Sequence, residues 1–84
     1  MTTGVQFRGT LQPSQTQRWF TFNWSADQHV LWEVVPTTAK SGAAQVDWDV
    51  AIERADNLHV TYWTTIQNLT NASVQFEARY AIIA

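Results

Sequence analysis

The side chains that could support nucleophilic or acid–base chemistry are few and scattered in this sequence. The two histidines are His29 and His59, and the serines at positions 14, 25 and 41 carry the hydroxyl groups that a histidine could activate. Such catalysis needs a positioned base with an orienting partner, and no G-x-S-x-G nucleophile motif is present. We therefore interpret both histidines as exposed or capping residues and expect no enzymatic activity.

The carboxylates offer a second kind of chemistry, which is the binding of a hard cation. Asp47, Asp49 and Glu53 fall on one side of an extended segment, and Ca²⁺ prefers several oxygen ligands of this type. No D-x-D-x-D-G loop is present, however, and carboxylates at alternate positions are equally typical of a solvated strand face. Two distant histidines without any cysteine provide no zinc-ligand spacing. The sequence therefore predicts no metal site and no cofactor.

Tryptophan is the most informative residue type here. The five tryptophans, at positions 19, 24, 32, 48 and 63, all lie in segments where apolar and polar residues alternate. Trp19 and Trp63 are out of step with their apolar neighbours and share their strand faces with Thr, Asn or Gln. If these faces are exposed, sugar rings could stack on the indoles while the polar neighbours bind sugar hydroxyls. The candidate ligand-binding residues are Trp19, Trp63, Thr21, Asn23, Thr61, Thr65 and Gln67.

Two alternatives to carbohydrate binding remain open for these tryptophans. The strand that carries Trp19 could be central and buried on both faces, or the tryptophans could fill an interface between copies of the chain, where aromatic residues are enriched. The sequence thus favours a non-catalytic binding module, with glycans or further copies of itself as partners.

These residues must be positioned by β-strands, because period-two alternation accounts for nearly the whole chain. The second predicted strand is aromatic on both sides, with Phe20, Phe22 and Trp24 on one face and Trp19, Thr21 and Asn23 on the other. In the first strand, Val5, Phe7 and Leu11 should share a face, while Gly9 marks either a bulge or a close approach. The six predicted strands span residues 5–11, 17–24, 29–35, 45–53, 58–67 and 74–82.

Six short strands separated by turn signals are typical of a small antiparallel β-sandwich. The turns contain Pro13, Asp27, Asp56 and Asn71, and the longest connection runs over residues 36–42. No linker, repeat or low-complexity segment interrupts the pattern. The sequence predicts one all-β, jelly-roll-like domain over residues 1–84, without a long helix.

The opening of the chain resembles a known family. Gly9-Thr10-Leu11, a polar turn, and the aromatic segment from Gln17 to Phe22 are similar to the first hairpin of bacterial pre-peptidase C-terminal-type domains. The segment from Thr61 to Asn68 resembles the later strand that carries an aromatic pair in those domains. This resemblance implies a jelly-roll-like sandwich that acts as a non-catalytic accessory module, in some cases binding sugars or calcium. No functional residue of that family maps onto a numbered position in this chain.

Composition excludes several other classes of function. The formal net charge is −2 with both signs scattered, so there is no basic stripe to neutralise phosphates, and we expect no nucleic-acid binding. The apolar runs are too short to span a bilayer, and the first residues lack the pattern of a signal peptide. We expect no membrane insertion and, as the sequence is written, a soluble cytoplasmic chain. With no cysteine, a small domain must be stabilised by aromatic packing or by oligomerisation.

Overall fold

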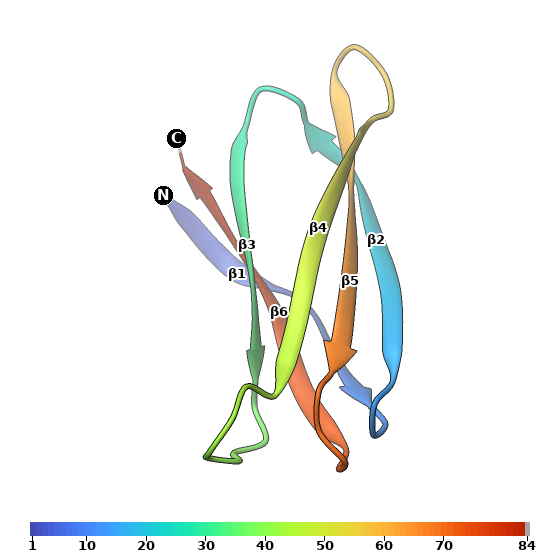
Figure 1. Cartoon of the computed structure of the whole chain (residues 1–84). Coiled ribbons are helices and arrows are strands. Elements are labelled where there is room, and N and C mark those ends of the chain that lie inside the picture. Colours follow the sequence, from blue (N-terminus) through green and yellow to red (C-terminus); the bar gives the residue numbers. More distant parts are fainter. Residues whose placement is uncertain (84) are drawn as a thin grey trace.

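The alternating segments form six strands, as the structure, a computed structural model, shows for residues 1–83 (Figure 1). No helix occurs among these residues, which confirms the prediction of an all-β chain. The first two strands begin earlier than expected, β1 by three residues and β2 by one, and each of the strands from β2 to β6 ends one residue later. Their bounds are β1 Thr2–Leu11, β2 Thr16–Ser25, β3 His29–Pro36, β4 Val46–Arg54, β5 His59–Asn68 and β6 Val74–Ile83.

The strands are arranged in two antiparallel sheets with a nested order. Sheet I has the order β1-β6-β3, and sheet II has the order β2-β5-β4. The first strand therefore pairs with the last and the second with the fifth, while β3 and β4 contact each other where the chain folds back. This is the winding of a jelly roll, so the predicted jelly-roll-like sandwich is confirmed.

The space between the sheets is filled by two groups of side chains. Leu11, Val34 and Phe76 from sheet I and Ile66 from sheet II form a buried cluster. Toward the end with the termini, four aromatic rings from both sheets meet at centroid distances of 5.4 to 6.1 Å, mostly edge to face. These rings belong to Trp24, Trp32, Tyr62 and Tyr80.

Two bulges correct the predicted strand faces. In β2 the register shifts between Thr21 and Trp24, and Asn23 has a φ of 65°. The shift places Trp24 on the inner face together with Trp19, while Phe20 and Phe22 point outward, so the predicted grouping of Phe20, Phe22 and Trp24 is wrong. An extra residue in one strand reverses the alternation, and period-two counting does not detect it.

The second bulge lies in β1, where the register shifts between Val5 and Phe7. Val5 pairs with Arg79 and Phe7 pairs with Ala78, so the two residues lie on opposite faces of sheet I. The prediction that they share a face is wrong for the same reason. Gly9 marks a close approach, since a Cβ there would lie 2.8 Å from Cζ of the buried Phe76 ring.

Candidate functional site

The outer face of sheet II brings together exposed aromatic and polar side chains. Central strand β5 presents alternate residues from Thr61 to Gln67 there, because the intervening Tyr62, Thr64 and Ile66 are buried against sheet I. The register places each of these residues between one side chain of β2 and one of β4. Successive outward rows are Phe20/Trp63/Ala51, Arg18/Thr65/Asp49 and Thr16/Gln67/Asp47.

Three aromatic rings, Phe20, Phe22 and Trp63, form what we call the aromatic platform. The Phe20 ring lies 5.0 Å from Trp63 and 6.1 Å from Phe22, with tilts near 30° in both pairs. Phe20 and Phe22 are 58% and 62% exposed, values unusual for large apolar side chains beside one another. The platform therefore presents phenyl rings, more than the indole, to solvent.

Two charged groups hold the indole of Trp63 in place. The Arg18 guanidinium carbon lies 4.9 Å from the centroid of the ring, which is a cation–π contact. Trp63 Nε1 donates a hydrogen bond of 3.1 Å to Oε1 of Glu53. Arg18 and Phe20 both contact Trp63, so the indole supports the platform and has little free ring surface for a ligand.

A polar hollow of about 240 Å³ continues the same face toward the start of β2. Its carboxylates, Asp47 and Asp49, accept hydrogen bonds, while the hydroxyl of Thr65 and the amide of Gln67 both donate and accept. The hollow is lined by Thr16, Asp47, Trp48, Asp49, Thr65 and Gln67.

The structure brings together four of the seven candidate residues and separates the others. Trp63, Thr61, Thr65 and Gln67 share the outer face of sheet II, although Thr61 is buried by its neighbours. Trp19 lies on the inner face, with its ring 5.3 Å from both Phe7 and Phe76. Trp19 and Trp63 thus lie on opposite sides of sheet II and form no common surface.

The remaining two candidates lie near the β2 bulge. The hydroxyl oxygen of Thr21 accepts hydrogen bonds from Nε1 of Trp24 and Nε2 of Gln6, at 3.0 and 3.1 Å. The hydroxyl of Thr21 therefore links β2 to Gln6 of β1. Asn23 is exposed, and its left-handed backbone makes the bulge.

Sequence reasoning did not identify Phe20, Phe22, Arg18 and Glu53 as parts of this face. The detectable signal was Asn23, because asparagine tolerates positive φ and can mark a bulge in an otherwise regular strand. If the alternation is counted separately on each side of this bulge, Trp19 and Trp24 fall on the inner face of β2 and Phe20 falls on the outer face. Glu53 and Arg18 are joined to Trp63 only by strand pairing, which the local sequence does not encode.

His59, one of the two histidines considered for catalysis, has a structural partner in Asp56. Nδ1 of His59 lies 3.1 Å from Oδ1 of Asp56, which also accepts hydrogen bonds from the backbone N–H of Leu58 and His59. The pKa of Asp56 is lowered, first by the Leu58 backbone bond and then by His59. Asp56 therefore closes the β4–β5 turn. Within residues 1–83 no group of three or more His, Cys, Asp or Glu side chains could hold a metal ion.

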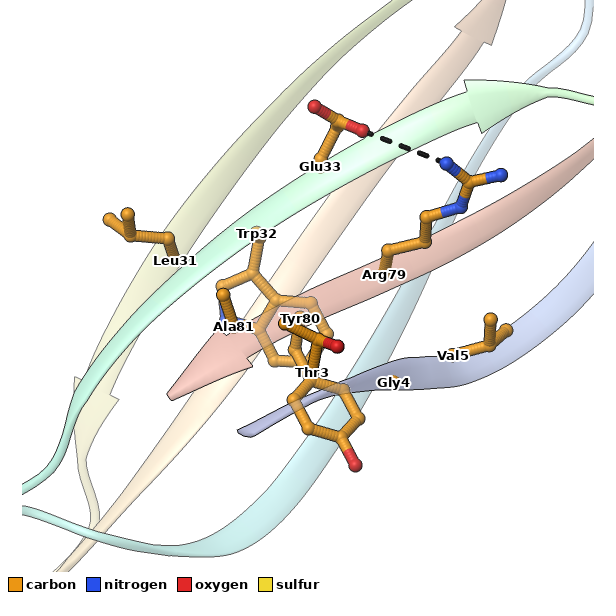
Figure 2. A pocket seen from close by; sticks show the side chains of 9 residues that line it. All are labelled: Thr3, Gly4, Val5, Leu31, Trp32, Glu33, Arg79, Tyr80 and Ala81. Carbon is orange, nitrogen blue, oxygen red and sulfur yellow. Dashed lines mark ion pairs between the residues drawn. The ribbon is translucent and has the colours of Figure 1, made fainter. Parts of the chain in front are cut away.

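A second hollow, of about 520 Å³, lies on the outer face of sheet I. Figure 2 shows Leu31 and Glu33 leaving β3 on one side of the strand and Trp32 leaving it on the other. The salt bridge across the hollow joins Nη1 of Arg79 to Oε1 of Glu33 at 3.9 Å. The two aromatic residues of its lining, Trp32 and Tyr80, pack between the sheets, so we place the ligand-binding candidate on sheet II.

Comparisons with protein-family models, curated proteins and solved structures gave no match. The resemblance to pre-peptidase C-terminal-type domains therefore stays a prediction. The described part of the chain contains no helix that is long and apolar enough to cross a membrane.

Proposed function

We propose that this chain is a non-catalytic binding module that binds carbohydrate on the outer face of sheet II. The observation that carries the proposal is the aromatic platform, with two largely exposed phenyl rings, adjoining a hollow of hydrogen-bonding side chains. A pyranose has an apolar C–H face and a rim of hydroxyls, and this surface offers a complement to each. Exposed clusters of large apolar residues commonly mark binding sites.

Each part of the surface has a distinct role in this proposal. Phe20 and Phe22 stack against the sugar, while Trp63, held by Arg18 and Glu53, supports them. Asp49, Gln67 and their neighbours bind hydroxyl groups, since carboxylates accept and amides both donate and accept.

The geometry of the face favours an extended glycan over a single sugar. Residues two apart in a strand are separated by about 6.8 Å, so the four alternate residues of β5 from Thr61 to Gln67 cover roughly 20 Å. The surface is open along that length, and the polar hollow beside the aromatic platform is open to solvent. An oligosaccharide of several units is therefore the expected ligand class.

Self-association through the aromatic platform is the alternative function. The same exposure of Phe20 and Phe22 would suit an interface between two copies, because aromatic residues are enriched at such interfaces. The two functions differ in what happens when the phenyl rings are removed.

A glycan array with the wild-type chain and a Phe20→Ser/Phe22→Ser variant tests the proposal. The matched control is Leu58→Ser, which changes an exposed apolar residue in the turn before β5. We expect binding to one class of oligosaccharide, a loss of at least about tenfold in the double variant, and no loss in the control. Both variants should keep the β-sheet circular dichroism of the wild type.

The mass in solution, recorded for the same samples, distinguishes the alternatives. Absence of glycan binding, together with an oligomer that only the double variant dissociates, would establish the self-association function. Absence of glycan binding with an unchanged mass would refute both functions of the aromatic platform.

A further inference from the structure

The four edge strands of the sandwich differ in how well they are protected against pairing with another chain. Exposed edges promote association, and proteins block them with bulges, prolines or charges. Edge strands β1 and β2 are each interrupted by a bulge. Edge strand β4 carries three carboxylates on its outward side, those of Asp47, Asp49 and Glu53. Edge strand β3 has a regular register from His29 to Pro36 and no bulge.

The free edge of β3 has a defined set of backbone groups. The N–H of Thr37 donates to the carbonyl oxygen of Gln75 in the register that pairs β3 with β6. Hydrogen-bonded pairs recur at every second residue of an antiparallel ladder, so the odd-numbered residues of β3 bond to β6. Val30, Trp32 and Val34 therefore direct their N–H and C=O groups away from sheet I, toward the open edge.

We propose that two copies of this chain pair antiparallel through β3, with Leu31 on the two-fold axis. In this register Val30 of one copy exchanges backbone hydrogen bonds with Trp32 of the other, which uses the free groups of both edges. Leu31 faces Leu31, and His29 faces Glu33, on the outer side of the joined sheet. Sheet I of one copy and sheet I of the other then form one continuous six-stranded sheet.

The side chains of β3 suit this pairing. Leu31 is 60% exposed and projects beside the hollow in Figure 2, so contact with its symmetry mate buries apolar surface. The Glu33 side chain is 67% exposed, and its 3.9 Å contact with Arg79 leaves it free to accept a hydrogen bond from an imidazole. No hydrogen-bond partner of the His29 ring occurs within residues 1–83. Each copy thus supplies one donor and one acceptor to the other, as an isologous interface requires.

The carboxylates of β4 disfavour its pairing with a second copy of itself. A two-fold register centred on Asp49 places Asp49 opposite its own symmetry mate. A register centred on Val50 places Asp47 opposite Glu53, and one centred on Ala51 places Asp49 opposite Glu53. Like charges directly opposite one another destabilise a strand pair. The charge pattern thus disfavours pairing through the middle of β4, whereas β3 places His29 opposite Glu33.

This interface lies on sheet I, away from the proposed glycan surface on sheet II, so each proposal can fail without the other. The first test is the mass in solution of the full chain over a range of concentrations, for the wild type and for Leu31→Lys. Because Leu31 is exposed, the lysine should leave the fold intact while placing two ammonium groups on the two-fold axis. The matched control is Leu69→Lys, an exposed apolar residue that follows β5 at the other end of the molecule.

We expect a dimer for the wild type and the control, and a dissociation constant at least about a hundredfold higher for Leu31→Lys. A wild-type chain that stays monomeric up to millimolar concentration would overturn the proposal. A dimer that Leu31→Lys leaves unchanged would overturn it as well, because the interface would then lie elsewhere.

A disulfide test reports on the register directly, since the chain has no cysteine of its own. In the proposed pairing Leu31 occupies a non-hydrogen-bonded site, where opposed Cα atoms lie about 4.5 Å apart and a disulfide can form. Leu31→Cys should therefore cross-link to a covalent dimer under mild oxidation. The control Ala51→Cys, exposed on β4, should remain mostly monomeric under the same conditions. Cross-linking of the control at the same rate as Leu31→Cys would refute the assignment to β3.

Discussion

Asn68 shows how a single buried polar residue can join several turns. Its side chain lies at the end of β5 and is 1% exposed. Its Nδ2 donates to the carbonyl oxygens of Leu11, Gln12 and Ala72, and its Oδ1 accepts from the N–H and hydroxyl of Thr70. The amide therefore satisfies backbone groups of the β1–β2 and β5–β6 connections together.

Replacing Asn68 by Asp should destabilise the fold by about 3 kcal/mol at neutral pH, because three carbonyl oxygens lose their donor and face a carboxylate instead. Urea or guanidinium unfolding measures this loss. The control Asn71→Asp changes an exposed residue that only accepts a bond from Lys40, and it should cost less than about 0.5 kcal/mol. Equal losses in the two variants would contradict the role given to Asn68.

Glu77 makes the stability dependent on pH. Its carboxylate accepts hydrogen bonds from Nε of Arg8 at 2.9 Å and from the guanidinium of Arg79 at 3.0 Å. Arg8, then Arg79, lowers the pKa of Glu77 below its ordinary value. A carboxyl group with a lowered folded-state pKa stabilises the fold above its unfolded pKa, and that stabilisation is lost as the pH falls through the folded pKa.

We therefore expect Glu77→Gln to lower stability at pH 7 and to have a smaller effect near pH 2. Denaturant midpoints of both chains at the two pH values check this. Asp27→Asn is the control, because no arginine contacts Asp27 within the described residues. A deficit of Glu77→Gln that is the same at both pH values would contradict the assignment.

At the scale of the element, the bulge in β2 decides which aromatic rings are exposed. Asn23 adopts a φ of 65°, which costs little for asparagine or glycine and much more for a β-branched residue. Asn23→Val should destabilise the chain by about 1 to 2 kcal/mol, whereas Asn23→Gly should be close to neutral. Thermal or denaturant unfolding measures both.

The control for this bulge is Gln17→Val, an exposed position in the same strand without a positive φ. It should change stability by less than about 0.5 kcal/mol. If valine were tolerated equally well at positions 17 and 23, backbone strain at the bulge would not be what selects asparagine.

At the scale of the whole molecule, the nested topology should make folding slow for a chain of this size. Leu11 pairs with Val74 and Thr2 pairs with Ile82, so sheet I forms only when the two ends of the described chain meet. Closing such long loops costs entropy before any contact compensates, and all-β domains of this kind refold in milliseconds to seconds. Stopped-flow tryptophan fluorescence measures the rate, and refolding in microseconds would contradict this expectation.

The sequence by itself determined the local structure. Alternation in segments such as Val46–Arg54, together with turn residues such as Pro13 and Asp56, was sufficient to predict six strands and an all-β sandwich. It also put Trp63 out of step with the apolar residues of its strand, and Trp63 lies on the outer face of sheet II. These features depend on residues close in sequence, and the period of a strand makes them readable.

Only the tertiary structure decided which rings face outward and which residues meet. The bulge at Asn23 determines that Trp19 faces the core and Phe20 faces solvent. Alternation alone predicted the reverse for both residues. The contacts of Trp63 with Arg18 and Glu53 arise because β5 lies between β2 and β4, a consequence of the jelly-roll winding. Pairing between distant strands depends on how the whole chain buries its apolar faces, so no local pattern specifies it.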